Sequence, residues 1–401
     1  MKIVVQKYGG SSLATPERIN SVAIRIKRKV EGGYKVVVVA SAMGKTTDEL
    51  IDLARSVTED PDPREMDMLL STGEQISVAL LAMALKDKGV KARSYNALQI
   101  EIKTTDHHTS ARIVDINVDR IKRLLEENDV IVVTGFQGVN ESGDLTTLGR
   151  GGSDTSAVAL AVKLSCPCEI YSDVDGIYTC DPRLYPGAKK HKYITYDDVL
   201  ELTSLGAKVL HSRAVELAKK YSVELYCASS FSEEEGTYVV GKLPEWLEEP
   251  VVTGASLDRN QVKVTISNVP NDQRILSKIF EDVAKANINV DMISLVPVGN
   301  KAFLSFTIPE GFEKSLEDTV ESTLEGLEDW NLEISKGFVK ISVVGVGMRS
   351  SPGVAARFFK TLSKAGVHVE LVTTSEIKIS CLIPEEFGEK ALRLVAEEFE
   401  L

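Results

Sequence analysis

The C-terminal third of the chain contains one pattern twice, and this repeat restricts the fold more than any other feature. The first copy has apolar strands at 262–266, 288–294 and 302–308, with a helix at 275–286 after the first strand. The second copy has the corresponding strands at 339–343, 367–373 and 376–383, with a helix at 353–365. A further helix follows the last strand of each copy. Two successive βαββαβ units, the ferredoxin-like arrangement, are therefore predicted.

Strands and helices alternate over the first 230 residues. The apolar strands are predicted at 3–6, 36–39, 129–134, 169–171 and 222–228, and 91–102 has the character of strand and loop. The helices are predicted at 16–30, 66–88, 118–128, 155–164, 196–204 and 206–220. This alternation predicts an α/β domain with a mainly parallel sheet between layers of helices.

An acidic segment separates the two kinds of pattern. Residues 244–250 contain Trp246 and three glutamates between two prolines, which is typical of a linker. The predicted domains are therefore 1–243, a linker at 244–250, a first repeat at 251–335 and a second repeat at 336–401.

Composition excludes several classes of protein. The net charge is −12 and no basic block occurs, so nucleic acid is not expected as the main partner. The 5 cysteines include no CxxC pair, which argues against a disulfide framework or a zinc site and favours a reducing, cytoplasmic setting. No signal-peptide pattern begins the sequence. The longest apolar stretch, 76–85, is too short to span a bilayer, so no membrane is expected.

Residues 149–156, with the sequence GRGGSDTS, concentrate the most chemistry. Glycines allow a ligand to approach the backbone closely, free N–H groups at a helix start bind anions, and Arg150 offers a planar fork to a carboxylate or phosphate. An alternative is an ordinary glycine loop in which Ser153 or Asp154 caps the helix.

Other polar stretches each have two interpretations. Residues 7–12 follow the first strand and could cradle phosphate. Residues 172–183 could hold a nucleotide and its metal, or form two Asx turns. Glu74 fits a capping box with Ser71. His107 and His108 are expected to be solvated, as is Lys208. Residues 41–48 resemble the end of a Walker A loop, but Val39 replaces its first glycine.

Together these stretches resemble the aspartate kinase family. Residues 7–12, KYGGSS, resemble the family signature KFGGTS. The motifs STGE at 71–74, GRGGSD at 149–154, SDVDGIYTCDPR at 172–183 and GAKVLH at 206–211 match the family in the same order. The C-terminal repeat is similar to the family's paired ACT domains, which are small amino-acid-sensing modules. The resemblance covers essentially the whole chain.

The resemblance implies ATP-dependent phosphorylation of the β-carboxylate of L-aspartate, giving 4-phospho-L-aspartate on the route to lysine, threonine and methionine. It implies ATP and Mg²⁺ as cofactors, with Mg²⁺ carried mainly by the ATP phosphates rather than by protein ligands. Two residues are implied as catalytic, with the carboxylate positioning the amine: Lys7 and Asp154. The implied aspartate site comprises Ser41, Thr47, Glu74, Arg150, Gly151, Gly152 and Ser153. The implied ATP site comprises Lys7, Tyr8, Gly9, Gly10, Ser11, Ser172, Asp173, Tyr178, Arg183 and Lys208.

Within the aspartate site, Glu74 would receive the α-amino group and Arg150 the α-carboxylate. The resemblance also implies feedback inhibition by lysine or threonine at the ACT pair, and the sheet edges of that pair favour a homodimer or homotetramer. Residues 96–101 and 270–274 depart from the family pattern. Two alternatives are an amino-acid kinase acting on glutamate and a catalytically silent amino-acid sensor.

Overall fold

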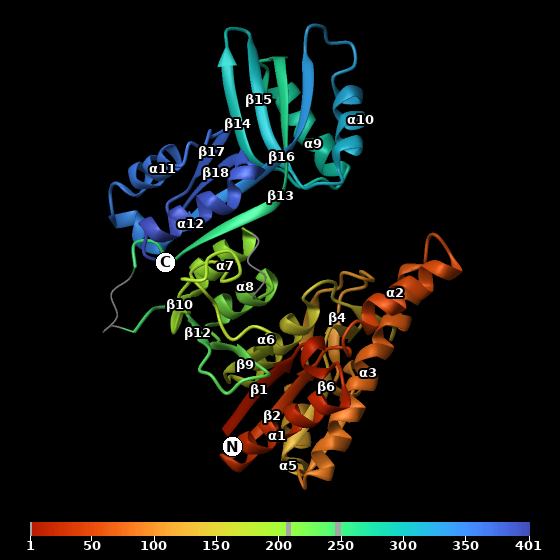
Figure 1. Ribbon diagram of the computed structural model, residues 1–401. Helices are drawn as coiled ribbons and strands as arrows, with labels where there is room; N and C mark the ends of the chain where they lie inside the picture. Colours follow the sequence, from red (N-terminus) through yellow and green to blue (C-terminus); the bar gives the residue numbers. More distant parts are fainter. Residues whose placement is uncertain (1, 206–209, 245–249) are drawn as a thin grey trace. The chain divides into compact units, whose positions relative to one another are not determined.

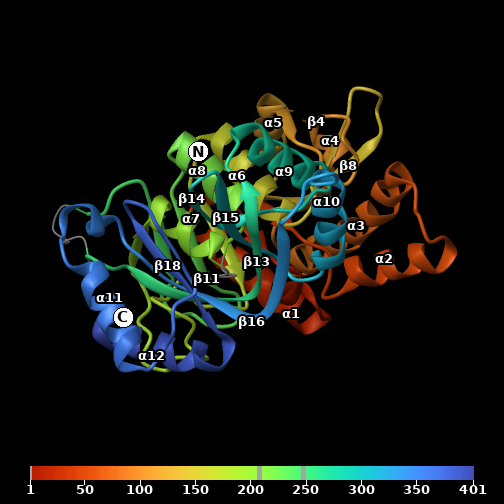
Figure 2. The same ribbon diagram turned by 90° about the horizontal axis from the view of Figure 1, so that it is seen from above.

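The computed structural model describes residues 2–205, 210–244 and 250–401, which form two compact units. The first unit contains residues 2–177, 190–203 and 210–244, and the second contains residues 178–189, 204–205 and 250–401. Figures 1 and 2 show both units, coloured along the chain.

The first unit is an α/β domain. Its strands are β1 (Lys2–Tyr8), β2 (Tyr34–Ala40), β3 (Ala92–Tyr95), β4 (Ile102–Thr104), β5 (Ile113–Ile116), β6 (Val130–Thr134), β7 (Gln137–Val139), β8 (Leu145–Thr147), β9 (Cys168–Ser172), β10 (Tyr193–Thr195), β11 (Leu225–Ser229) and β12 (Thr237–Val240). Its helices are α1 (Pro16–Glu31), α2 (Thr46–Val57), α3 (Pro63–Asp87), α4 (Ala97–Ile100), α5 (Val118–Glu127), α6 (Gly152–Leu164), α7 (Tyr196–Ser204) and α8 (Ser212–Tyr221), with a 3₁₀ turn η1 (Gly10–Leu13).

Eight of these strands form one sheet in the order β10-β12-β11-β9-β1-β2-β6-β3. Every neighbouring pair is parallel except β11 and β12. The central strands β1, β2 and β6 are rich in valine, which suits strands covered on both faces. The predicted mainly parallel sheet is confirmed. Its parallel strands end at one edge, where ligands bind in open α/β folds.

Side-chain alternation along β1 assigns its residues to the two faces of the sheet. Val4 and Tyr8 lie in the core beneath α1 and α3, together with Val36, Val38 and residues of both helices. Successive side chains of a strand point to opposite faces, so Lys7 points to the other face. That face is covered by α6, which contacts β1, β2 and β9.

The sequence analysis missed two features of the first unit. A second, four-stranded sheet with the order β5-β4-β7-β8 occupies segments that were expected to be loops or left unassigned. Helix α2 follows the Walker-like stretch, where no helix was predicted, and it has no buried residue. The strands of the small sheet are only three or four residues long, and α2 is a helix without a buried residue.

Helix α3 is the one helix among the described residues that is long and apolar enough to cross a membrane, with a mean hydropathy of 1.5 over a half-buried window. It packs against α1, α2 and the strands β3, β6 and β8. It also buries two carboxylates, Asp67 and Glu74. A core helix of a globular domain has this combination of properties, so its composition follows from its place against the sheet.

The second unit contains the repeat. Its strands are β13 (Gly254–Pro270), β14 (Asp291–Val298), β15 (Lys301–Ile308), β16 (Asn331–Val344), β17 (Leu371–Thr374) and β18 (Lys378–Pro384). Its helices are α9 (Gln273–Lys285), α10 (Glu313–Thr323), α11 (Val354–Lys364) and α12 (Gly388–Glu398), with 3₁₀ turns η2 (Val346–Ser350) and η3 (Glu385–Phe387). The strands form one antiparallel sheet with the order β14-β15-β13-β16-β18-β17.

Each ferredoxin-like half of this sheet has its own apolar core, which confirms the predicted pair. One core lies under α9 and α10, and the other lies under α11 and α12. The long strands β13 and β16 serve both halves. Residues 262–270 of β13 pair with β15, whereas residues 254–258 pair with residues 340–344 of β16. The second half is thus completed by residues that precede the first half in sequence.

The compact units differ from the predicted boundaries in two places. Residues 254–258 were assigned to the first repeat, but their strand partner belongs to the second. Residues 178–189 were assigned to the N-terminal domain, but they belong to the second unit, where Cys180, Leu184 and Tyr185 join the core under α11 and α12. Both differences arise from pairings between distant segments, which local sequence patterns do not reveal.

Candidate active site

A cavity of about 640 Å³ lies in the first unit, where the segments after β1 and β2 meet the start of α6. Helices α2 and α3 line its other side. The predicted site residues that line this cavity are Lys7, Gly10, Ser41, Thr47, Glu74, Arg150, Gly151, Gly152, Ser153 and Asp154. The structure therefore brings together every residue of the predicted aspartate site and both predicted catalytic residues.

Lys7 and Asp154 form an ion pair across the cavity wall. The distance from Lys7 Nζ to Asp154 Oδ1 is 2.7 Å, and both side chains are largely buried, at 12% and 13% exposure. Lys7 belongs to the face of β1 covered by α6, and Asp154 lies in the first turn of α6. A carboxylate in this position fixes the ammonium group at the cavity surface.

Glu74 is a buried acid of the cavity, not a cap. The capping-box interpretation is wrong, because Ser71 and Glu74 lie in the middle of the 25-residue helix α3. The carboxylate of Glu74 is 2% exposed and accepts a hydrogen bond from the backbone N–H of Ala42, at 3.1 Å. Burial raises its pKa from 4.5 to about 7, and the bonds to its carboxylate oppose that rise.

The N-cap position of α6 is a glycine, and no polar side chain caps the helix. The interpretation of Ser153 or Asp154 as a cap is wrong, because the N-cap residue is Gly151 and no side chain caps the helix. Gly151 has φ of +70°, and a Cβ there would lie 1.9 Å from Cγ of His211. The side chains of Ser153 and Asp154 line the cavity instead. Arg150 is exposed at the same turn, free to reach a ligand.

The turn that was expected to cradle phosphate follows β1 as η1. Gly10 faces the neighbouring turn so closely that a Cβ would lie 2.8 Å from the carbonyl oxygen of Ala42. Tyr8 does not offer its ring to a nucleotide, because its side chain is fully buried and stacks on Tyr171, with ring centroids 5.1 Å apart. Its position on β1 directs it into the core, so only its backbone remains for the predicted ATP site.

The remaining predicted ATP residues do not line the cavity. Gly9 and Ser11 lie in the turn after β1, and Ser172 and Asp173 lie at the end of β9. Tyr178 and Arg183 belong to the second unit. Arg183 is exposed, and its Nε and Nη2 donate hydrogen bonds to the Asp181 carboxylate, at 3.0 and 2.7 Å. Lys208 lies outside the described residues.

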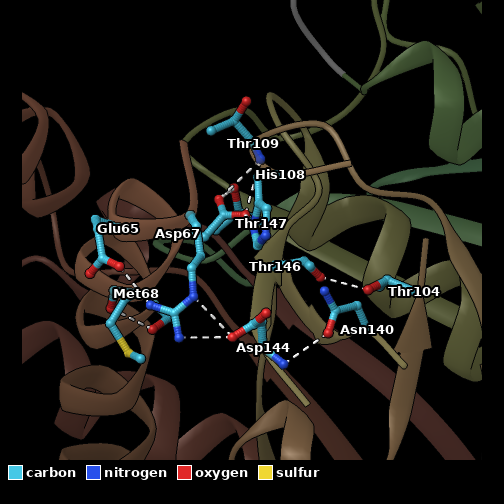
Figure 3. Close-up of polar contacts among 12 residues, drawn as sticks. Glu65, Asp67, Met68, Thr104, His108, Thr109, Asn140, Asp144, Thr146 and Thr147 are labelled. Atoms are coloured by element: carbon cyan, nitrogen blue, oxygen red, sulfur yellow. Dashed lines mark hydrogen bonds and ion pairs between the residues drawn. The ribbon is translucent and has the colours of Figure 1, made fainter. Parts of the chain in front are cut away.

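Sequence reasoning missed the carboxylate that organises one wall of the cavity. Figure 3 shows Asp67 among His108, Thr109 and Thr147. Asp67 is fully buried and accepts hydrogen bonds from the Thr109 N–H, at 3.0 and 3.1 Å, and from Thr147 Oγ1, at 2.5 Å. His108 Nδ1 lies 2.7 Å from Asp67 Oδ2, so the expectation that His108 is solvated is wrong. Thr109 and Thr147 both line the cavity.

A signal for Asp67 was present in the sequence. Asp67 and Glu74 are seven residues apart, so they share one face of α3, and the buried residues of that face are otherwise apolar or small. Two acids on the buried face of a helix need partners or a ligand. Other residues of the cavity that were not predicted include four from α2 and the segment after it: Asp48, Ile51, Arg55 and Pro61.

Comparison with known protein families identifies the family of the chain. The amino acid kinase family matches residues 2–229, and an ACT domain family matches residues 341–399. An aspartokinase from Geobacillus stearothermophilus is 46% identical over 403 residues, covering 100% of this chain and 98% of that protein. The chain belongs to the aspartate kinase family.

Other aspartate kinases align over all or nearly all of this chain. The aspartate kinase of Pseudomonas putida is 43% identical over 403 residues, covering 100% of this chain and 98% of that protein. The aspartate kinase structure from Synechocystis is 43% identical, with a TM-score of 0.56, and covers 99% of this chain and 69% of that one. Aspartokinase III of E. coli, solved with aspartate and ADP, is 24% identical and shares the fold over 100% of both chains, with a TM-score of 0.80. The enzyme class predicted from the motifs is confirmed.

Proposed function

We propose that this aspartate kinase transfers the γ-phosphoryl group of ATP to the β-carboxylate of L-aspartate in the cavity of the first unit. The observation that carries the proposal is the placement of Glu74, Arg150 and the Lys7–Asp154 pair around one cavity. An acid and an arginine can together recognise the two charges of a free amino acid, and a fixed ammonium can meet the phosphate.

The proposed chemistry needs little proton transfer. The β-carboxylate of aspartate is already a nucleophile at neutral pH, so the main barrier is the approach of two anions. One carboxylate oxygen attacks the γ-phosphorus, the bond from phosphorus to the β,γ-bridging oxygen breaks, and ADP leaves with that oxygen. Lys7, held by Asp154, neutralises charge that spreads over the phosphoryl oxygens. The N–H groups at the start of α6 and in the turn after β1 add positive ends of dipoles.

Glu74 and Arg150 are assigned to the two ends of the amino acid. The Glu74 carboxylate would accept a hydrogen bond from the α-ammonium group. The approach of that cation would favour the ionised form of the carboxylate despite its burial. Arg150 would bind the α-carboxylate with two parallel hydrogen bonds. Ser41 is fixed near them because its carbonyl oxygen accepts a hydrogen bond from Ser77 Oγ of α3, at 2.7 Å.

The nucleotide is proposed to bind at the edge of the sheet, beside the turn after β1. That turn is tied to the ends of β9 and β11, because Ser12 Oγ donates to Ser230 Oγ at 2.8 Å and Ser230 N–H donates to the Ser172 carbonyl at 2.8 Å. The described residues contain no group of three His, Cys, Asp or Glu side chains suited to an ion. We assign Mg²⁺ to the ATP phosphates, where it would neutralise charge.

Trapping the acyl phosphate tests this assignment. The full-length enzyme is incubated with ATP, Mg²⁺, L-aspartate and hydroxylamine, which converts the product into a coloured hydroxamate. Aspartate should give hydroxamate and glutamate should not. Lys7→Met should lower kcat by roughly 100-fold or more, whereas Lys45→Met, at an exposed lysine next to the cavity, should not. Turnover of glutamate in place of aspartate would show a different amino-acid kinase.

Feedback regulation is proposed for the second unit, on the route to lysine, threonine and methionine. The aspartokinase III of E. coli has been solved with lysine and aspartate, and this chain shares the paired ferredoxin-like units. Lysine and threonine should be titrated separately and together into the activity assay. If neither amino acid changes the rate, the pair does not regulate this enzyme in that way. Regulation requires the effector to bind two conformations with different affinities.

A homo-oligomer and a cytoplasmic setting complete the proposal. The edge strand β14 carries Ile293, Val296 and Val298, each more than half exposed, and an apolar edge strand is a surface that a second copy can cover. All five cysteines, which lie in the described part of the chain, are free thiols, as expected in a reducing compartment. Light scattering at several concentrations would distinguish dimer from tetramer.

A further inference from the structure

An arginine of α8 holds the backbone from which Arg150 projects. Arg213 lies in the first turn of α8, which packs against α6 (Figures 1 and 2). Its Nη1 donates a hydrogen bond to the carbonyl oxygen of Leu148, and its Nη2 donates one to the carbonyl oxygen of Ala111, each at 3.0 Å. Leu148 immediately precedes the glycine turn at residues 149–152. One guanidinium group therefore joins two backbone segments next to that turn.

Both of these segments belong to the wall of the cavity. Thr109 and Thr147 line it beside Arg150. The segments are bonded to each other, because the Ala111 N–H donates to the Thr147 carbonyl at 2.9 Å. On the side of α3, the Asp67 carboxylate holds both threonines, as Figure 3 shows. The wall is thus tied to α3 by a carboxylate and to α8 by a guanidinium group.

The guanidinium group of Arg213 is committed to the backbone rather than to an acid. Within the ranges that the structure describes, Arg213 forms no ion pair, and burial together with the nearby Arg112 lowers its pKa. A partly buried charge needs partners, and here two carbonyl oxygens supply them. Because the guanidinium group is planar and its donors have a fixed geometry, it also sets the separation of the two segments.

The turn at residues 149–152 depends on such outside contacts. Three of its four residues are glycines, and glycine has more backbone freedom than any other residue. A backbone bond closes the turn, from the N–H of its last residue to the carbonyl of its first, at 3.0 Å. Contacts from α8 add to this bond, because the ring of His211 packs on Gly151 and Arg213 holds the residue before the turn.

We propose that Arg213 is a positioning residue for aspartate recognition. By bridging the Leu148 and Ala111 carbonyls, it fixes the turn from which Arg150 reaches the α-carboxylate of the substrate. This inference rests on the proposed binding of aspartate in the cavity. Arg213 lies behind the cavity wall and acts through the backbone, so it should affect the binding of aspartate and leave the binding of ATP largely unchanged.

Kinetics of two Arg213 variants of the full-length enzyme test the proposal. Arg213→Met removes the donors at similar side-chain length, and the KM for aspartate should rise roughly 10-fold, as expected when charge-assisted hydrogen bonds that order the site are lost. The KM for ATP should stay within about twofold of wild type. Arg213→Lys keeps the charge but offers a single nitrogen in place of the fork, so the KM for aspartate should rise roughly threefold. Circular dichroism checks that each variant is folded, and the lysine variant carries the test if the methionine variant is not.

A double-mutant cycle asks whether the effect passes through Arg150. In an Arg150→Gln background, either Arg213 change should alter the KM for aspartate by less than about twofold, because the contact that Arg213 positions is already absent. A merely structural role would raise the KM by the same factor with and without Arg150.

Arg25 provides a matched control. It is also a partly buried arginine of the first unit, and its Nη2 donates to a backbone carbonyl, that of Ser232, at 2.5 Å. It belongs to α1, which covers the face of the sheet opposite α6. Arg25→Met should lower the urea midpoint of the enzyme without changing the KM for aspartate.

The outcomes separate the two proposals. If wild-type enzyme makes no hydroxamate from aspartate, the proposed function fails. If wild type makes it but the folded Arg213 variants leave the KM for aspartate unchanged, or raise it equally with and without Arg150, the inference about Arg213 is overturned while the function stands. An equal rise in Arg25→Met would also overturn it.

Discussion

The pKa of Glu74 leads to a stability test that needs no substrate. In the folded chain, burial raises this pKa from 4.5 to about 7. Between these two values the folded state holds a proton that the unfolded state has lost. Each tenfold change in proton affinity corresponds to about 1.4 kcal/mol, so the ionised side chain destabilises the fold by about 3 kcal/mol above pH 7 and by nothing below pH 4.5.

Replacing Glu74 by glutamine removes this titration. Relative to wild type, the free energy of unfolding of Glu74→Gln should rise as pH increases from 5 to 8, gaining about 2.5 kcal/mol across the window. A constant offset is also expected, because the new amide places its NH₂ group near the NH₂ of Gln137, 3.5 Å from Oε2. Only the pH-dependent part of the difference bears on the pKa.

Urea denaturation of the full-length wild type and variant, followed by far-ultraviolet circular dichroism from pH 5 to 8, measures this difference. All other titrating groups are common to both proteins and cancel in the comparison. A difference that stays constant across the window would refute the argument, because it would mean that Glu74 titrates at its ordinary pKa in the folded chain.

Two further predictions concern the walls of the cavity. Gly151→Ala should destabilise the enzyme by about 2–5 kcal/mol, because the backbone is left-handed there and the new Cβ would overlap His211. Gly143→Ala, at φ +85° with open space around it, should destabilise it by only about 1–2 kcal/mol. Equal urea midpoints for the two variants would contradict this. Asp67→Asn should raise the KM for aspartate several-fold, because it weakens the hydrogen bonds by which Asp67 holds the cavity wall. Glu169→Gln, at a buried acid away from the cavity, should change stability alone. An equal change in the KM for aspartate in both variants would count against the role of Asp67.

The long elements of the fold could be predicted because their hydrophobic patterns are local. Helices α1 and α3 and strands β2 and β6 each carry a buried face that the sequence displays at the period of a helix or as a continuous apolar run. The pairing of residues 254–258 with the second half of the repeat could not be predicted, because it depends on strand register between segments more than 80 residues apart.

The part of the candidate site that could be predicted consists of charged residues named by the family motifs. The motifs predicted that Lys7, Glu74 and Asp154 belong to one site, and all three line the same cavity. The local patterns around Glu74 and Asp154 also fitted helix caps. The burial of the Tyr8 side chain could not be foreseen from the motif, because a family motif names a position without saying which face of the strand its side chain takes.

The kinetics of Arg150→Gln test the central claim, that this cavity binds aspartate by its charged ends. Arg150 is exposed at the cavity rim, so its replacement should leave the fold intact. Loss of a bidentate contact to the α-carboxylate should raise the KM for aspartate by roughly 100-fold and leave the KM for ATP within about twofold. The same change at Arg55, on the α2 side of the cavity, should have a much smaller effect. An unchanged KM for aspartate in Arg150→Gln, or a rise in the KM for ATP instead, would contradict the account.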